Sequence, residues 1–230
     1  MEYIILIETS TALCSTALAK DGEIISYRES SGQKAHASLT APFIQEMLEE
    51  NGMTIRDCSA VCVSMGPGSY TGLRVGVSTA KGLCFGADIP LIAVGTLDTL
   101  VWQAISEDAL PEGCKYIVPM VDARRMEVYT AVFSPEGKQL TETAPHIMTE
   151  ESFTAELAES PVLFIGDGAK KCRGILTHPN AHFAQCCPKA SSMLMPAMKE
   201  FNEGHFRDVA YFEPFYLKEF VATVSKKKLF

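Results

Sequence analysis

The residues with the clearest potential for chemistry form a glycine-rich segment. It reads Gly66-Pro67-Gly68-Ser69-Tyr70-Thr71-Gly72-Leu73-Arg74 and follows an apolar run at residues 60–64. Glycine permits positive φ and lets the backbone approach a ligand closely, and the first N–H groups of a helix attract anions. The segment therefore predicts either an anion site centred on Gly66, Gly68 and Ser69, or an ordinary turn from a strand into a helix.

Three motifs that would make this segment catalytic or nucleotide-binding are absent from it. No Gly-Lys pair follows Gly66 or Gly68 at the spacing of a Walker loop. A nucleophile elbow has glycine two residues before and after its serine, whereas Ser69 has Pro67 and Thr71 there. The glycine spacing also differs by one residue from the dinucleotide fingerprint Gly-x-Gly-x-x-Gly. We therefore expect no catalytic residue in this segment.

Two acids that end apolar runs are further candidates. Glu8 ends the first run of the chain, and Asp122 ends a later run and is followed closely by Arg124. Such carboxylates can hold a cation or water, and Arg124 could bind a phosphate. The structural alternative is that Asp122 pairs with Arg124 or Arg125 and holds a hairpin.

The eight cysteines and five histidines do not form a pattern typical of a metal site. There is no Cys-x-x-Cys motif, and Cys58 and Cys62 have no nearby histidine to complete a zinc site. Pro179 would break a helix that aligned His178 with His182, so we interpret that pair as part of a loop. We expect no bound metal, and cysteines that serve as small apolar side chains in a reducing compartment.

Composition and charge exclude several classes of function. With 230 residues, 47% of them hydrophobic, the chain can bury a substantial core. Its net charge of −8 disfavours independent binding to nucleic acid, and we interpret the basic run at residues 226–228 as a solvated tail. No apolar run is long enough to cross a bilayer, and no basic leader precedes the first strand-like run. We therefore expect a cytoplasmic protein that is not associated with a membrane.

The elements that position these candidates follow the same order in both halves of the chain. In the first half we predict strands at residues 3–8, 14–20, 23–29 and 60–64, a helix at 37–50, and a second helix from the glycine-rich segment to about Gly86. In the second half we predict strands at 116–121, 127–134, 139–143 and 162–165, a helix from about Thr149, and a final helix at 190–201. The repeated order predicts a duplicated α/β fold with a cleft between two lobes, at residues 1–105 and 106–230.

Duplicated halves that each open on an acid-tipped strand resemble the ribonuclease-H-like lobes of actin, the sugar kinases and the Hsp70 ATPase, with mixed sheets flanked by helices. Within that fold the chain resembles the TsaB (YeaZ) family from end to end, and the glycine-rich segment is the most specific match. The other matching motifs are Ile7-Glu8-Thr9-Ser10-Thr11, Asp122-Ala123-Arg124-Arg125-Met126-Glu127-Val128-Tyr129, Gly166-Asp167-Gly168-Ala169 and Pro214-Phe215-Tyr216-Leu217.

The resemblance implies a non-catalytic subunit for threonylcarbamoylation of N6 of the adenosine adjacent to the anticodon in tRNA. In that family the partner TsaD transfers the threonylcarbamoyl group from an adenylate, and TsaE is an ATPase. The implied partners are therefore TsaD and TsaE, with tRNA contacted indirectly through the complex and a homodimer as a further association. The resemblance implies no cofactor for the chain alone, and a nucleotide only at the interface of the complex.

The resemblance also implies a partner surface on the helices of the first lobe. Small residues along the second helix predict close helix packing, and His36 is expected to make a contact at a helix start or at the interface. The residues assigned to this surface are His36, Tyr70, Thr71, Gly72, Arg74, Gly76 and Ala80.

Two rival functions remain alternatives at the level of sequence. The first is an autonomous ATPase or phosphotransferase of the same fold. Thr9 and Ser10 stand where a kinase phosphate loop has glycine, and Glu8 stands where most relatives have Asp, so both features count against it. The second is a peptidase, for which the sequence offers no zinc pair, no Ser-His-Asp context and no activated cysteine.

Overall fold

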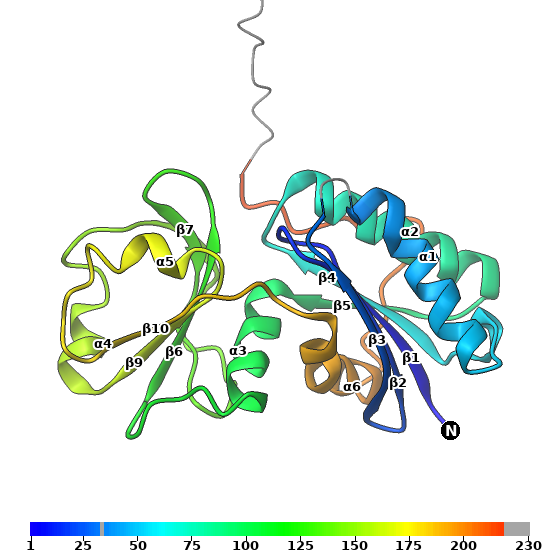
Figure 1. The fold of residues 1–230 in the computed structure, drawn as a ribbon, viewed down its shortest axis with the longest axis horizontal. Helices are drawn as coiled ribbons and strands as arrows, with labels where there is room; N and C mark the ends of the chain where they lie inside the picture. Colours follow the sequence, from blue (N-terminus) through cyan, green and yellow to red (C-terminus); the bar gives the residue numbers. More distant parts are fainter. Residues whose placement is uncertain (33–34, 219–230) are drawn as a thin grey trace, which may run out of the picture.

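A computed structural model of the protein describes residues 1–32 and 35–218, and it consists of two α/β lobes side by side (Figure 1). The basic run at residues 226–228 lies outside the described residues. Each lobe is built on one five-stranded sheet.

The first lobe contains a mixed sheet in the order β3-β2-β1-β4-β5. Its strands are β1 (Tyr3–Glu8), β2 (Cys14–Lys20), β3 (Glu23–Ser30), β4 (Ala60–Gly66) and β5 (Leu91–Gly95). β1, β2 and β3 pair antiparallel, whereas β4 and β5 run parallel to β1. β1 is buried from Ile4 to Glu8 because helices cover both faces of the sheet.

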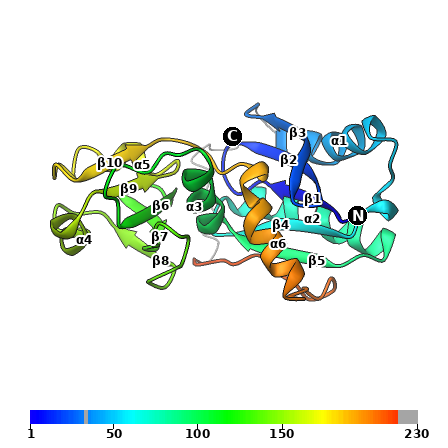
Figure 2. The ribbon, with the colours of Figure 1, turned by 90° about the horizontal axis from the view of Figure 1, so that it is seen from below.

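Successive residues of β1 face opposite layers of helices, as the alternation of a strand requires. Ile5 and Ile7 pack against α1 (Ala35–Glu50) and α2 (Tyr70–Ala87), with the short helix η1 (Ile55–Asp57) at the edge of that layer. Ile4 and Leu6 pack against η2 (Ala190–Met193) and α6 (Leu194–Asn202) on the other face. Figure 2 shows α6 lying across the strands of this sheet.

The second lobe repeats the first, with the order β10-β9-β6-β7-β8. Its strands are β6 (Tyr116–Asp122), β7 (Glu127–Thr130), β8 (Ala144–Ile147), β9 (Val162–Ile165) and β10 (Ala181–Ala184). Three strands are again antiparallel and two run parallel to the central strand. α3 (Thr96–Ser106) packs on one face, and α4 (Thr154–Glu159) and α5 (Ala169–Cys172) pack on the other. The predicted duplicated α/β fold is confirmed.

Four element predictions in the second half are wrong in detail. The second strand ends at Thr130 instead of Ser134. The third strand lies at Ala144–Ile147 instead of 139–143, since residues 131–143 make only isolated bridges through Phe133. The helix begins at Thr154, because Thr149 starts a turn in which its N–H donates to Ser152 Oγ at 3.0 Å. His182 lies in strand β10 and not in a loop.

The last described part of the chain returns to the first lobe, although the sequence predicted it to belong to the second. Ala190, Met193 and Ala197 pack against the apolar face that Ile4 and Leu6 present. That face needs a cover, and η2 and α6 supply it. The division at residue 105 therefore does not describe residues 190–212, which belong to the first lobe by their packing.

Candidate functional site

A cleft of about 630 Å³ lies between the two lobes. Its walls are the β1–β2 loop, the β4–α2 turn, the β6–β7 turn and the segment at residues 215–218. The sequence candidates that line it are His36, Gly68, Ser69, Tyr70, Thr71, Asp122 and Arg124. The fold therefore brings the glycine-rich segment of one lobe opposite Asp122 and Arg124 of the other.

The β4–α2 turn is packed against the protein's own β1–β2 loop. The Ser69 N–H donates to the Ser10 carbonyl at 2.6 Å. A Cβ atom on Gly68 would lie 2.3 Å from the Ser10 carbonyl oxygen, and a Cβ atom on Gly72 would lie 2.1 Å from that of Thr9. These glycines are needed because backbone approaches them closely, but the approaching backbone comes from the same chain.

The two remaining candidates of the anion site also make contacts within the protein. Gly66 has φ 110°, and a Cβ atom there would lie 2.9 Å from the Phe215 carbonyl oxygen. The hydroxyl of Ser69 caps α2, since Ser69 Oγ accepts from the Gly72 N–H at 3.3 Å. The geometry thus favours the structural interpretation of the turn over an anion site.

Glu8 is fully buried behind the cleft and does not line it. Its Oε1 accepts from the Ser10 N–H at 2.6 Å, whereas Oε2 has no hydrogen-bond partner among the described residues. Burial raises the pKa of Glu8 to about 7, and the hydrogen bond from Ser10 only partly opposes this shift. The carboxyl group is therefore not exposed to a ligand in the cleft.

Asp122 is held by a lysine that the sequence did not suggest. Its Oδ1 accepts from the Lys171 ammonium group and from the Arg124 N–H, the latter at 2.8 Å. Its own N–H donates to Asp167 Oδ1 at 2.9 Å, and burial raises the pKa of Asp167. The expected ion pair of Asp122 with Arg124 or Arg125 is wrong, since its ion pair is with Lys171 and Arg124 contacts it through the backbone N–H.

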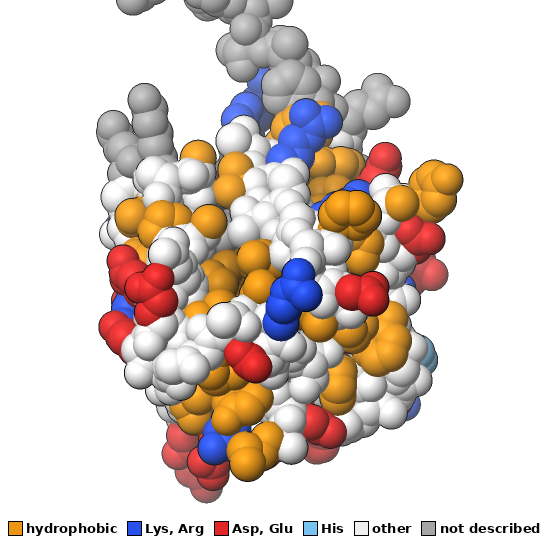
Figure 3. Space-filling model, turned by 90° about the vertical axis from the view of Figure 1, so that its right-hand side faces the viewer, with side chains coloured by type: hydrophobic (Ala, Val, Ile, Leu, Met, Phe, Trp, Pro, Cys, Tyr) orange, Lys and Arg blue, Asp and Glu red, His pale blue; other side chains and the backbone are white. Residues whose placement is uncertain are grey.

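The outer side of α2 forms a shallow groove of about 660 Å³ with the start of α1. Its lining residues are Ala37, Tyr70, Thr71, Arg74, Val75, Ser78 and Thr79. Farther along α2, Phe85 is 85% exposed. Figure 3 views this end of the first lobe and shows hydrophobic side chains interspersed with acidic ones. Tyr70, Thr71 and Arg74 of the predicted partner surface therefore do lie on the outside of the lobe.

Three residues assigned to the partner surface face inward instead. Gly72, Gly76 and Ala80 are buried within the first lobe. A Cβ atom on Gly76 would lie 2.2 Å from Thr9 Oγ1, so the small side chains make room for the β1–β2 loop. Their assignment to a partner surface is wrong. His36 is half-buried, and its Nε2 lies 2.8 Å from the Thr11 carbonyl oxygen, which ties α1 to the same loop.

Sequence reasoning assigned no role to Phe215 and Tyr216, although both line the cleft. The Phe215 N–H donates to the Met65 carbonyl at 2.7 Å, and the Tyr216 ring lies 4.9 Å from that of Tyr70. The motif Pro214-Phe215-Tyr216-Leu217 was the signal that could have identified them.

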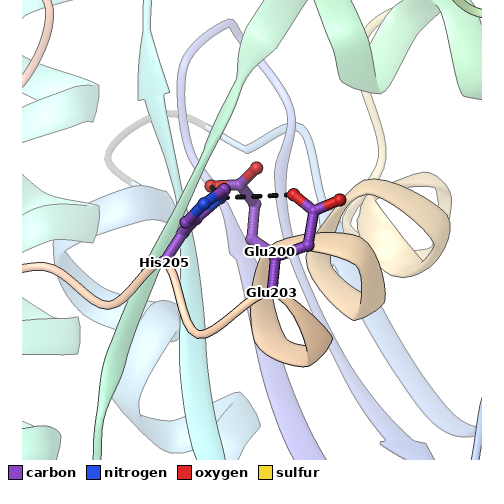
Figure 4. A group of neighbouring side chains, drawn as sticks. All are labelled: Glu200, Glu203 and His205. Carbon is purple, nitrogen blue, oxygen red and sulfur yellow. Dashed lines mark ion pairs between the residues drawn. The ribbon is translucent and has the colours of Figure 1, made fainter.

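Among the described residues, one group of three side chains could in principle hold a metal ion: Glu200, Glu203 and His205 at the end of α6 (Figure 4). His205 Nδ1 lies 3.5 Å from a Glu200 oxygen and 3.4 Å from a Glu203 oxygen. The Arg207 guanidinium also lies 3.7 Å from Glu200. None of these residues lines the cleft, and their mutual contacts suit an exposed ion-pair network.

Within the described residues, no helix is both long enough and apolar enough to cross a membrane.

Comparison with known proteins adds three findings. The family model for TsaD, tRNA N6-adenosine threonylcarbamoyltransferase, matches residues 29–226. The tRNA threonylcarbamoyladenosine biosynthesis protein TsaB of Escherichia coli is 30% identical, over 95% of this chain and 96% of its own, and that of Haemophilus influenzae is 31% identical, over 98% and 96%. Among solved structures, YeaZ from Pseudomonas aeruginosa has the same fold, with a TM-score of 0.79 and 24% identity over 94% of this chain and all of its own.

Proposed function

The chain belongs to the TsaB family of tRNA threonylcarbamoyladenosine biosynthesis proteins, and from this premise we propose that it is a non-catalytic subunit. Its role is to support a TsaD-type transferase that modifies N6 of the adenosine adjacent to the anticodon in tRNA. TsaE takes part as a further component, and tRNA is bound mainly by the partners, since this chain carries a net charge of −8.

The main structural support for this proposal is the contact between the β1–β2 loop and the start of α2. Kinases of related fold need room for phosphate at such a loop, but here the Thr9 and Ser10 carbonyls lie against Gly72 and Gly68. Any phosphate would have to displace backbone that hydrogen bonds to Ser69. The lobe is thus arranged as a packed unit, which suits a scaffold better than a phosphotransferase.

The proposed partner surface is the outer groove of α1 and α2. The partner matches the same family model as this chain, so we expect it to present a lobe with an equivalent pair of helices. Arg74 is the one cation among the described residues that line this groove, and its guanidinium lies 4.3 Å from the centre of the Tyr70 ring. A charge reversal at Arg74 therefore tests the surface directly.

The experiment combines the purified chain with TsaD, TsaE, tRNA and threonylcarbamoyl adenylate, and measures modified adenosine. We expect product only when the chain and TsaD are both present. Arg74→Glu should weaken the complex at least about tenfold, as one lost interface contact of about 1.4 kcal/mol does. Arg173→Glu is the matched control, because Arg173 also lies over an aromatic ring, 5.5 Å from the centre of Phe183, but in the second lobe. Product formation by TsaD and TsaE alone at the full rate would contradict the proposal.

The alternative is an autonomous ATPase, which one feature of the cleft favours. Its volume of about 630 Å³ suits a small molecule, and the buried hydroxyls of Ser10 and Thr11 have no partner among the described residues. An assay of ATP hydrolysis by the isolated chain separates the two functions. We expect no turnover, and turnover that survives repeated purification would favour the alternative.

A further inference from the structure

After α6 the chain forms a segment that contains a turn but no helix, residues 207–218, which we name the C-terminal strap. The Arg207 N–H donates to the Leu91 carbonyl at the edge of β5. The Lys81 ammonium of α2 then donates to the carbonyls of Ala210 and Phe212, at 3.0 and 3.1 Å. The strap is therefore attached to the first lobe at the edge of β5 and beside α2.

The end of the strap reaches both the cleft and the outer groove. Phe215 hydrogen bonds to the end of β4, and its carbonyl occupies the space beside Gly66. Two residues farther on, Leu217 lines the cleft, and the Lys218 ammonium pairs with Glu127 of β7 in the second lobe. These contacts hold the residue between them, Tyr216, at the edge of α2.

Tyr216 contacts Tyr70 and Arg74, which both line the outer groove. Its ring lies 4.9 Å from that of Tyr70, with 37° between the ring planes. A hydrogen bond from Arg74 to Tyr216 raises the pKa of Arg74, and the same guanidinium lies over the Tyr70 ring. Tyr216, Tyr70 and Arg74 thus form one cluster, in which Arg74 has a defined direction although it is exposed.

We propose that Tyr216 is a positioning residue for the partner surface. It holds Tyr70 and Arg74 in the arrangement that a second subunit with the same type of lobe recognises, so affinity depends on a residue more than 140 positions away from Arg74 in the sequence. The inference rests on the proposed function, since it takes the TsaD-type subunit as the partner.

The physical basis is the entropy of an exposed arginine. An unrestrained guanidinium samples many rotamers, and ordering it on binding opposes association. The contacts of Tyr216 with the Tyr70 ring and with Arg74 restrict Arg74 before the partner arrives. The Tyr216 ring contributes through its tilted contact with the Tyr70 ring, and its hydroxyl contributes a hydrogen bond that phenylalanine lacks.

The test measures affinity for purified TsaD by calorimetry, beside a melting curve for each variant. Tyr216→Ala should bind about tenfold more weakly, as loss of one aromatic pair and one hydrogen bond implies. Tyr216→Phe should recover most of that loss, because the ring contact with Tyr70 remains. Tyr211→Ala is the matched control, since Tyr211 lies in the same strap and is 84% exposed.

A double variant shows whether Tyr216 acts through Arg74. If it does, Tyr216→Ala should have little further effect once Arg74→Ala is present, whereas independent contacts would give additive losses. Additive losses, an equal loss in Tyr211→Ala, or wild-type affinity in a normally folded Tyr216→Ala would each overturn the inference. Failure of the unchanged chain to bind TsaD would instead overturn the proposed function.

Discussion

Glycines of α2 differ in what an added methyl group would contact. Gly72 is buried, and a Cβ atom there would lie 2.1 Å from the Thr9 carbonyl oxygen. Gly82 is exposed on the same helix, with no atom within 4 Å of such a Cβ. Gly76 resembles Gly72, because a Cβ atom there would also clash with the β1–β2 loop. A tryptophan at Gly76 would therefore disrupt the lobe, and its effect on binding could not be assigned to a partner surface.

We predict opposite effects on stability for alanine at these two positions. Gly72→Ala should lower the free energy of unfolding by about 2 kcal/mol or more, because backbone atoms must shift. Gly82→Ala should raise it by up to about 1 kcal/mol, since alanine favours a helix. Urea unfolding of both variants measures the difference. Similar values for the two would show that the β1–β2 loop does not pack against α2 as described.

A buried carboxyl group makes stability depend on pH. Because burial raises the pKa of Glu8 from 4.5 to about 7, the folded protein binds more protons than the unfolded chain between these values. Stability therefore falls as pH rises through this window, and the loss is complete above about pH 7. At roughly 1.36 kcal/mol per pKa unit the full effect is about 3 kcal/mol.

Glu8→Gln should remove the loss of stability at high pH, because glutamine carries no charge. Its side-chain oxygen can still accept the hydrogen bond from the Ser10 N–H. We predict that it raises the free energy of unfolding at pH 8 and changes it much less at pH 5. Urea unfolding at both pH values checks this, with the exposed Glu151→Gln as control. The same gain at both pH values would contradict the raised pKa.

At the scale of elements, the start of α2 depends on a cap. Ser69 has extended backbone angles, and its hydroxyl accepts from the Gly72 N–H. This arrangement satisfies one of the N–H groups that the first turn of a helix leaves without a partner. The glycine-rich segment is thus a turn, a cap and a contact for the β1–β2 loop.

Ser69→Ala should lower the free energy of unfolding by about 1 kcal/mol. Ser69→Asp should lower it much less, because aspartate also caps helices. Thermal and urea unfolding measure both variants. If Ser69 serves only as a ligand-binding residue, the alanine variant will unfold like the original chain, which would contradict the capping role.

At the scale of the whole molecule, the first lobe depends on residues from the end of the chain. Ala190, Met193 and Ala197 cover the face of the first sheet formed by Ile4, Leu6 and Ile92. Without this cover, a row of large apolar side chains would contact water, which costs about 25 cal/mol per Å².

We predict that a chain truncated after residue 188 aggregates or loses cooperative unfolding. Gel filtration and circular dichroism measure this, and truncation after residue 218 is the control because it leaves η2, α6 and the C-terminal strap in place. A monomeric truncated chain with a sharp melting transition would show that the first lobe folds without them.

The sequence alone predicted most elements of the first lobe and the repeated order of elements, but not β5, α3 or β10. The apolar runs of β1 and β4 and the spacing of apolar residues in α1 indicate which segments are buried, and Asp21-Gly22 specifies a hairpin between β2 and β3. These signals are local, since each depends on residues within a few positions of one another. Such local signals are enough to recognise a repeated order of elements. They are also enough to show that the glycine-rich segment contains none of the catalytic motifs considered.

Only the tertiary structure decided what each buried face contacts. The small residues of α2 predicted close packing by another helix, but Gly72 and Gly76 lie against the β1–β2 loop and Ala80 lies in the core of the first lobe. The pairing of Asp122 with Lys171 joins positions 49 residues apart, and the contact of Tyr216 with Tyr70 joins positions still farther apart. Periodicity shows that a face is covered, whereas the covering element is selected by shape and charge among residues distant in the chain.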